Sequence, residues 1–188
     1  MFLFYFTDTR QYILHTGDFR AGTSVIEDPM LQNINIDTVY LDTTYLDSYY
    51  KFESQEIVIN LGVKTIQEEL KKYPDSLIIC GSYTIGKERV FTSIADQIGS
   101  KIYVKREKKK ILDCLMDSKL KSKLTLNPNE TNLHVLPMNI LAINDLIEYL
   151  ANFPVYKRVI AIKPTGWTHN SDSSLNVICK RPNAIIYG

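Results

Sequence analysis

Apolar and polar residues alternate in short blocks near the start of the chain. Met1 to Phe6 is apolar, Thr7 to Arg10 is polar, and Tyr12 to Leu14 is apolar again. Two apolar runs around a short polar turn predict a β-hairpin. A further apolar run, Val39 to Leu41, stops at Asp42. This part of the chain therefore predicts strands joined by tight turns.

The rest of the chain repeats a strand followed by a helix. After Ser54, apolar residues recur at helical spacing up to Pro74, which predicts a helix that ends near Tyr73. The same criteria predict strands over 77–80, 101–104, 134–137, 158–162 and 184–187, helices over 87–98, 107–120 and 144–152, and a plain loop over 127–132. Because strand–helix–strand units place parallel strands beneath crossover helices, we predict an α/β fold with a mainly parallel sheet.

Composition supports a folded chain and leaves its partners open. The chain has 188 residues, a hydrophobic fraction of 45% and a net charge of +1. This length allows one domain, or one and a piece, with a sizeable core. A balanced charge does not indicate a nucleic-acid binder as a whole, so any basic surface must be local. The apolar start is too short for a signal-peptide core or a membrane span, and we expect no membrane partner.

Cysteine and histidine spacing argues against a metal site made of neighbouring residues. Cys80, Cys114 and Cys179 show no Cys-x-x-Cys pair, which predicts neither a disulfide framework nor a thiolate zinc site and favours an intracellular, reducing compartment. The three histidines also lack metal-ligand spacing; they are His15, His134 and His169. We expect His15 to orient the turn at Asp18 rather than to bind a metal itself.

Two aspartates follow apolar runs at comparable positions. Asp18 comes after Ile13 and Leu14 through a turn that contains Gly17, and Asp42 comes directly after Val39 to Leu41. Ligands of α/β folds lie past the carboxyl ends of strands, and a glycine lets the backbone approach a ligand closely. Each aspartate alone is also a common turn or helix cap. The paired pattern makes both candidates for chemistry.

A glycine-rich stretch stands between a predicted strand and a predicted helix. Gly81 to Lys87 has the Gly-x-x-x-x-Gly-Lys spacing of a P-loop, but Glu88 stands where the magnesium-binding Ser or Thr belongs. A weaker interpretation keeps a phosphate-binding turn, with Ser82, Tyr83 and Lys87 as the contacts. The alternative is a turn that needs glycine geometry, with Lys87 solvated.

Two further segments have open interpretations. Lys163 to Trp167 follows a buried strand, and its Thr165 and Gly166 either contact a substrate strand or form a tight turn plugged by Trp167, the only tryptophan. Nine basic residues lie between Lys101 and Lys123, opposed by three acidic ones. They form either a solvated helix face or a footprint for a DNA backbone.

Five ordered blocks resemble one family. They are His15-Thr16-Gly17-Asp18-Phe19-Arg20, Leu41-Asp42-Thr43-Thr44-Tyr45, the stretch Cys80 to Glu88, Ile98-Gly99-Ser100-Lys101 and Pro164-Thr165-Gly166-Trp167-Thr168-His169. With them the chain is similar, over essentially its whole length, to the DNA cross-link repair nucleases of the metallo-β-lactamase/β-CASP class, relatives of Artemis. Five blocks in order are more specific than any single motif.

The resemblance implies a domain organisation and an activity. It implies strands of a partial metallo-β-lactamase sandwich in residues 1–50 and a C-terminally incomplete β-CASP α/β domain in residues 51–188. It implies a nuclear, metal-dependent phosphodiesterase of interstrand cross-link or double-strand break repair, typically a 5′-to-3′ exonuclease. Its cofactor would be one or two zinc ions, and its partner DNA with a 5′-phosphate end.

The resemblance also implies roles for single residues. Asp18 resembles the aspartate that ligates the active-site zinc, and Asp42 resembles the first acidic motif beside the metals. The implied contacts with DNA or phosphate are Ser82, Tyr83, Lys87, Thr165 and Gly166. In such a site, zinc lowers the pKa of a bound water, and the hydroxide attacks phosphorus.

Three histidine blocks of the family do not occur in the sequence. These are His-x-His-x-Asp-His, Asn-His-Cys-Pro-Gly-Ala and Ser-Glu-His-Ser; in addition, Lys163 replaces the usual Arg. We therefore expect the chain to be a piece of a longer nuclease that alone neither binds zinc tightly nor cuts DNA, since Asp18 is one ligand where zinc needs three or four. A native mass well above 21.6 kDa would identify the longer protein.

Two other functions stay open. A DNA- or phosphate-binding fragment without catalysis predicts salt-sensitive DNA binding without cleavage. A P-loop-like nucleotide binder using Gly81 to Lys87 predicts that ATP protects the protein in thermal melts.

Overall fold

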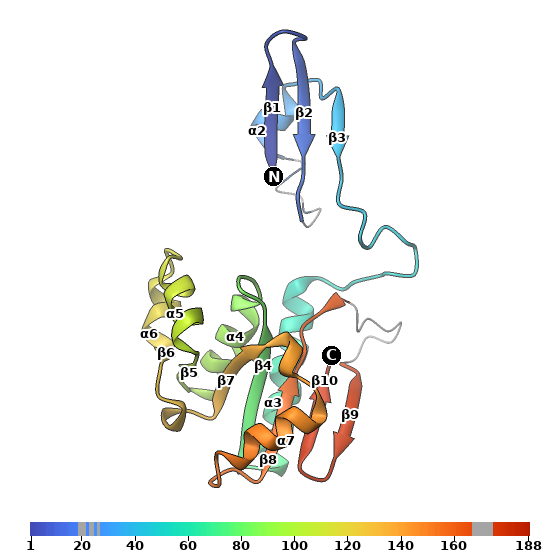
Figure 1. The fold of residues 1–188 in the computed structure, drawn as a ribbon. Helices are drawn as coiled ribbons and strands as arrows, with labels where there is room; N and C mark the ends of the chain where they lie inside the picture. The colour runs from blue at the N-terminus through green and yellow to red at the C-terminus, as the bar shows by residue number, and fades with distance from the viewer. Residues whose placement is uncertain (19–21, 23–24, 26, 167–174) are drawn as a thin grey trace. The chain divides into compact units, whose positions relative to one another are not determined.

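The computed structural model describes residues 1–18, 22, 25, 27–166 and 175–188 (Figure 1). These residues form two compact units, Met1–Tyr50 and Lys51–Gly188. None of their helices is long and apolar enough to cross a membrane. The predicted α/β class is confirmed, because the larger unit contains helices and a mostly parallel sheet.

The first unit is a three-stranded sheet in the order β1-β2-β3. The predicted hairpin is confirmed: β1 (Phe2–Phe6) pairs antiparallel with β2 (Gln11–His15). The third strand, β3 (Thr38–Tyr40), runs parallel to β2. A short helix that the sequence analysis did not predict, α2 (Pro29–Gln32), begins where the Asp28 side chain accepts a hydrogen bond from the Met30 amide.

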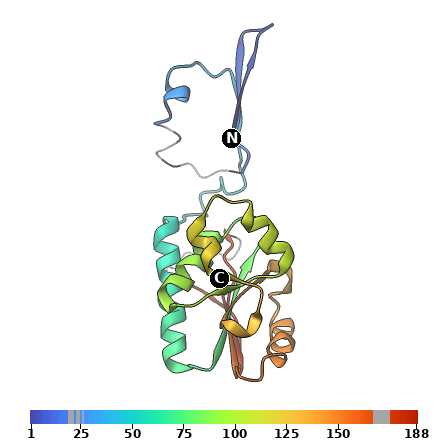
Figure 2. The same ribbon diagram turned by 90° about the vertical axis from the view of Figure 1, so that its left-hand side faces the viewer.

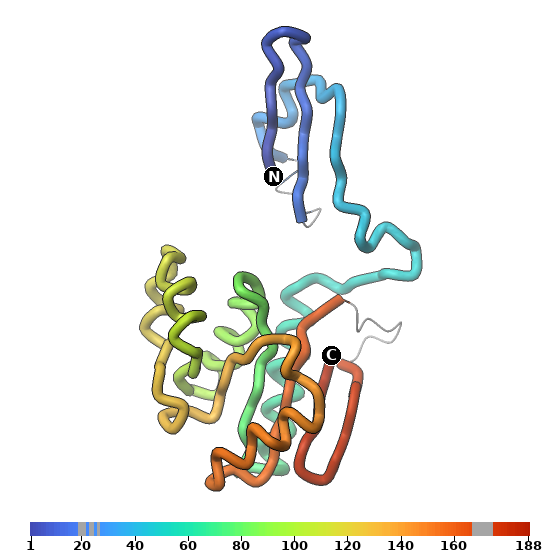
Figure 3. Tube along the Cα trace, in the orientation of Figure 1, coloured from blue at the N-terminus to red at the C-terminus, as the bar shows by residue number. Residues whose placement is uncertain are grey.

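The second unit is built on a seven-stranded sheet in the order β6-β5-β7-β4-β8-β10-β9. Its strands are β4 (Ser76–Ser82), β5 (Ile102–Tyr103), β6 (Leu124–Thr125), β7 (Leu133–Pro137), β8 (Arg158–Ile162), β9 (Val177–Arg181) and β10 (Ala184–Tyr187). All neighbouring strands are parallel except β9 and β10. The chain leaves β4, crosses to β5 and later returns through β7 to lie beside β4 (Figure 3).

Helices cover both faces of this sheet. They are α3 (Gln55–Lys72), α4 (Glu88–Ile98), α5 (Arg106–Asp113), α6 (Ser118–Lys123) and α7 (Ile143–Ala151), with short 3₁₀ turns η1 (Pro128–Glu130) and η2 (Met138–Ile140). Alternate residues of β4 point to opposite faces. Ile78 and Cys80 pack with α3, α4, α5 and α6, whereas Leu77 and Ile79 pack with α7. Figure 2 shows α3 and α7 on opposite sides of the sheet.

Local sequence signals explain most helix ends. The Ser54 hydroxyl accepts a hydrogen bond from the Ile57 amide at the start of α3, and α4 ends at Gly99 with φ +68°. The predicted single helix over 107–120 was wrong. Two helices stand there, because Asp117 caps a new helix through the amide of Leu120. The predicted plain loop over 127–132 contains the 3₁₀ turn η1.

Candidate functional site

The carboxyl ends of β4 and β7 form a topological switch point. The two strands are neighbours, but α4 follows β4 on one face of the sheet and α7 precedes β8 on the other. Chains that leave adjacent parallel strands toward opposite faces open a crevice between them, which is the usual ligand position of such folds. A groove of about 470 Å³ lies here, lined by residues after both strands, including Ser82 to Thr84 and Pro137 to Asn139.

The loop after β4 is held by an ammonium group from α5. Lys108 Nζ donates to the Ser82 hydroxyl at 3.0 Å and to the carbonyls of Tyr83 at 2.8 Å and Thr84 at 3.0 Å. It also lies 3.6 Å from a carboxylate oxygen of Glu88. Burial lowers the pKa of Lys108, and the Glu88 carboxylate opposes that shift. The oxygens of the loop thus bind the ammonium group of Lys108.

Glu88 closes the same loop from the other side. Its Oε1 accepts a hydrogen bond from the Gly86 amide at 2.8 Å, and the Ser82 hydroxyl donates to the Gly86 carbonyl at 3.0 Å. A P-loop instead turns its amides inward toward phosphate. Here the Tyr83 and Thr84 carbonyls face inward, so a phosphate in the position of the Lys108 ammonium would meet oxygen atoms. This geometry argues against the nucleotide-binding alternative.

The residues after β4 that were predicted to contact phosphate differ in how exposed they are and in which bonds they make within the loop. Ser82 is 4% exposed, and its hydroxyl is used within the loop. Tyr83 is 53% exposed on the rim of the groove. Lys87 has φ +71° and stands at the start of α4, where its side chain makes no capping hydrogen bond. Tyr83 is thus exposed to a ligand, whereas Ser82 shapes the loop.

Thr165 and Gly166 lie beyond the neighbouring strand β8. β4 and β8 pair in parallel with Cys80 opposite Ile162, so the segments that follow them leave the sheet at the same edge. The Thr165 amide donates to the Lys163 carbonyl at 2.9 Å, and the Lys163 amide donates to Tyr187. The structure thus brings the two predicted phosphate-binding segments to one edge of the sheet. Trp167 and His169 lie outside the described residues.

In the first unit, a buried threonine joins the two acidic turns. β2 and β3 are parallel, so the turns with Asp18 and Asp42 leave the sheet at the same edge. Thr16 is 2% exposed; its hydroxyl donates to the Gly17 carbonyl at 2.9 Å and accepts from the Asp42 amide at 3.1 Å. Asp42 Oδ1 in turn accepts hydrogen bonds from Thr44. The paired pattern in the sequence thus corresponds to two turns that lie together.

The imidazole of His15 is bonded to the turn that carries Asp18. Its Nδ1 accepts a hydrogen bond from the Gly17 amide at 3.1 Å, and its ring stacks on Tyr40. A neutral imidazole that accepts at Nδ1 carries its proton on Nε2, where it cannot ligate a metal. These contacts support the expectation that His15 orients the Asp18 turn.

The described residues do not form a metal site on their own. No group of three or more His, Cys, Asp and Glu side chains gathers among them in a geometry that could hold a metal ion. Asp18 offers a carboxylate at an exposed turn, which is one ligand where a stable zinc site needs three or four.

Most of the basic segment is neutralised by acidic partners. The described ion pairs are Lys101–Glu130, Lys108–Glu88, Lys109–Asp113, Lys119–Asp96 and Lys123–Asp96. The remaining four basic residues make no ion pair with another described residue; they are Lys105, Arg106, Lys110 and Lys121. A broad DNA footprint over the whole segment is therefore not supported, and any local one must lie at these four.

Similarity to known proteins defines the class. The model of the family described as DNA repair metallo-beta-lactamase matches residues 118–188, from α6 to the end of the sheet. Together with the relatives named next, this match shows that the chain belongs to the metallo-β-lactamase/β-CASP family of DNA cross-link repair proteins. The sequence-based recognition of this family is confirmed.

Individual relatives extend the similarity to both units. The chain is 44% identical to the DNA cross-link repair 1A protein of Gallus gallus over 193 aligned residues, which cover 100% of this chain and 20% of that protein. It is 40% identical to the DNA cross-link repair protein SNM1 of Arabidopsis thaliana, over 84% of this chain and 33% of that protein. It is 30% identical to the 5' exonuclease Apollo of Danio rerio, over 80% of this chain and 26% of that protein. The chain spans a fifth to a third of these relatives.

Two residues that hold the candidate segments in place, one in each unit, were not predicted from the sequence. Lys108 stood among nine basic residues, and only its position in the first turns of a helix beside the loop distinguishes it. Thr16 stood between His15 and Gly17, and no local pattern showed that its hydroxyl would reach Asp42, 26 residues later. Both signals are long-range contacts, which a single sequence does not display.

Proposed function

We propose that this chain acts in a metal-dependent DNA-repair nuclease that hydrolyses phosphodiester bonds. The observation that carries the proposal is the 44% identity to a DNA cross-link repair protein across the whole chain. The metallo-β-lactamase family implies metal ions, typically zinc. We take the substrate to be DNA with a 5′-phosphate end, the direction to be 5′ to 3′, the lesions to be interstrand cross-links or double-strand breaks, and the location to be the nucleus.

The two compact units carry different parts of this function. We assign Met1–Tyr50 to the metallo-β-lactamase portion and Lys51–Gly188 to the β-CASP portion. Asp18 supplies one ligand to one or two zinc ions, and Asp42 acts beside them. Thr16 supports this assignment because it fixes both turns with one buried hydroxyl. His15 orients the Asp18 turn from behind.

The sheet edge of the second unit contacts the DNA backbone. Tyr83 and Lys87 stand after β4, and Thr165 and Gly166 stand after β8 on the neighbouring strand. Basic side chains and backbone amides at such an edge are suited to phosphate oxygens. Ser82 keeps the loop in shape through Lys108 and Gly86.

Aspartate substitutions test the proposal. In the protein isolated from its own cells, Asp18→Ala should lower cleavage of 5′-phosphorylated single-stranded DNA by about a hundredfold or more, because a lost metal ligand removes several kcal/mol of transition-state stabilisation. Asp47→Ala is the control, because Asp47, like Asp18, is an exposed aspartate at a bend of the first unit and has no proposed role in catalysis. Equal activity of Asp18→Ala and the control would contradict the role of Asp18.

A second candidate function is DNA binding without catalysis. It is favoured by the finding that the described residues gather no metal site. The isolated 188-residue chain would then bind DNA in a salt-sensitive way and leave it uncut with zinc present. Metal-dependent cleavage by this chain alone would rule out that candidate.

A further inference from the structure

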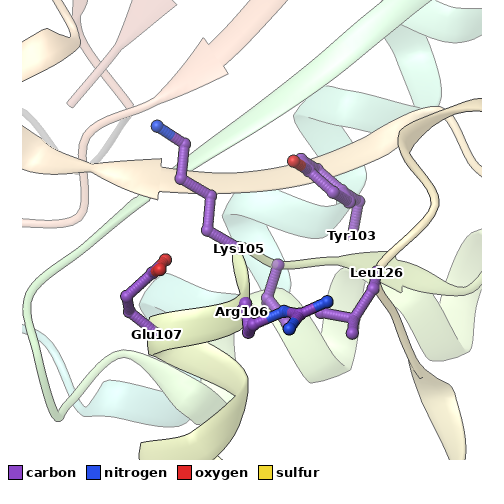
Figure 4. A pocket seen from close by; sticks show the side chains of 6 residues that line it. Tyr103, Lys105, Arg106, Glu107 and Leu126 are labelled. Carbon is purple, nitrogen blue, oxygen red and sulfur yellow. The ribbon is translucent and has the colours of Figure 1, made fainter.

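The start of α5 carries two cations without acidic partners beside two hollows. Lys105 and Arg106 are exposed and make no ion pair with another described residue. Figure 4 shows their side chains pointing in different directions, with Arg106 beside Leu126. Lys108 is bonded to Glu88 and the loop, and Lys109 pairs with Asp113, whereas Lys110 lines neither hollow. Lys105 and Arg106 are therefore the cations at these hollows that are available to a ligand.

The larger hollow is the groove at the switch point, and its floor is apolar. It is lined by Ile111 from α5, by Leu136 in β7 and by Met138 at the start of η2. Tyr83 and Asn139, both exposed, stand on its rim. Its volume of about 470 Å³ is within the range of small-molecule sites and exceeds what a single base requires. An apolar floor with an aromatic ring at the rim favours a flat, unstacked base.

A smaller hollow lies on the other side of Lys105. It has a volume of about 300 Å³ and is lined by Tyr103, Arg106 and Leu126, among others. Lys105 and Glu107 line both hollows. Lys105 thus stands between the two recesses and Arg106 lines the smaller one, an arrangement that suits a chain of alternating phosphates and bases better than an isolated phosphate.

Glu107 narrows the class of ligand. Its exposed carboxylate faces both hollows and disfavours a ligand that is only an anion, such as a polyphosphate. A carboxylate accepts hydrogen bonds from the exocyclic amines of bases. The site therefore combines two cations for phosphates, an apolar floor for a base, and an acceptor for a base edge.

We propose that a single strand of DNA crosses the start of α5, with its phosphates on Lys105 and Arg106 and one base in the groove between β4 and β7. This proposal rests on the proposed nuclease function for the choice of DNA. It adds a binding site for the strand away from the acidic turns. A paired base cannot enter the groove, so the site selects single-stranded over duplex DNA.

Binding without cleavage tests the site separately from catalysis. The 188-residue chain is titrated, with a chelator present, against a single-stranded oligonucleotide of about twelve nucleotides that has a 5′-hydroxyl and a 3′ fluorophore. Single strands lose affinity with salt by a slope of about 0.7 per neutralised phosphate. Lys105→Ala with Arg106→Ala should lower that slope by about 1.4 and weaken binding at low salt.

The control removes two charges from the same segment. Lys109→Ala with Lys119→Ala takes away lysines that pair with Asp113 and Asp96, and this variant should keep the wild-type slope. An abasic strand of the same length should bind at least about fivefold more weakly, because base stacking contributes about 1–3 kcal/mol per base. Free thymidine monophosphate should compete only weakly.

Each opposite result overturns the site. These results are an unchanged slope in the Lys105 and Arg106 variant, an equal loss in the control, equal affinity for the abasic strand, tight binding of the free nucleotide, and no binding of the strand at low salt. If the Lys105 and Arg106 variant keeps both its nuclease activity and the wild-type salt slope of DNA binding, the proposed strand site is wrong and the proposed nuclease function stands. Loss of activity in Asp18→Ala with normal binding would affect only the proposed function.

Discussion

At the scale of single residues, one partly buried and one fully buried polar side chain specify their surroundings. Lys108, with 13% of its side chain exposed, satisfies three oxygens of the loop after β4. His134, fully buried in β7, accepts from the Tyr149 hydroxyl at 2.9 Å and donates to the carbonyls of Pro128 and Thr131. Buried polar groups of this kind cost free energy when a partner is lost, so both positions are testable.

Replacing Lys108 should destabilise the second unit. Lys108→Met leaves Glu88 and two carbonyls without their cation, and we expect the free energy of unfolding to fall by about 2–4 kcal/mol. Lys109→Met, whose pair with Asp113 lies at the surface, should change it by about 0.5 kcal/mol or less. Urea denaturation measures both, and equal losses would contradict the role of Lys108. Adding Glu88→Gln to Lys108→Met should restore part of the loss.

Protonation of His134 should make stability depend on pH. Burial lowers the pKa of His134 from its ordinary 6.5, and its bonds to Pro128 and Thr131 oppose the shift. Below pH 6.5 the unfolded chain therefore binds a proton that the folded chain does not, and stability falls as pH falls toward the lowered pKa. The loss is at most about 1.4 kcal/mol per pH unit.

Urea denaturation at pH 7.5 and pH 5.5 measures this change, and the free energy of unfolding should be lower at pH 5.5. On the order of one proton is taken up on unfolding. His134→Asn should be less stable at the higher pH, because the Tyr149 hydroxyl loses its acceptor, and should show a smaller loss on acidification. The remaining histidines are common to both proteins. The same pH dependence in wild type and His134→Asn would contradict the assignment.

At the scale of elements, local signals predicted most of the second unit. Strands β8 and β10 have the predicted bounds, and α3 begins directly after its Ser54 cap and ends before Pro74 as expected. The missed elements lack strong local patterns. β9 is exposed along most of its length and, among the described strands, pairs with β10 alone, so no buried apolar run marks it in the sequence.

Gly81 marks a close contact between elements. A Cβ at this position would meet the Met138 sulfur and lie 2.8 Å from Leu141 Cδ2, so Gly81→Ala should lower the free energy of unfolding by about 1–3 kcal/mol through overpacking. Met138→Ala in the same chain should relieve part of that clash. At Gly62 in α3 a Cβ would meet only ordinary contacts, so Gly62→Ala should stabilise by about 0.5–1 kcal/mol. Thermal unfolding distinguishes the two, and equal effects would contradict the packing argument.

At the scale of the whole molecule, the sequence indicated which segments matter but not how they are held. Asp18 and Asp42 were chosen because each follows a strand, and parallel pairing of β2 with β3 explains why their turns lie together. The Gly81 to Lys87 spacing suggested a phosphate loop, whereas its carbonyls bind Lys108. The glycine spacing of the motif predicts a tight backbone turn. Which group binds inside that turn depends on Lys108 of α5, which lies more than 20 residues later in the sequence.

One measurement tests the nuclease assignment most directly. The protein isolated from its source cells is incubated with single-stranded DNA that carries either a 5′-phosphate or a 5′-hydroxyl, before and after chelation and zinc restoration. We predict release of nucleotides from the 5′-phosphorylated end, loss of cleavage on chelation and recovery with zinc. Absence of cleavage by the metal-loaded protein, or cleavage that chelation does not change, would contradict a metal-dependent DNA-repair nuclease.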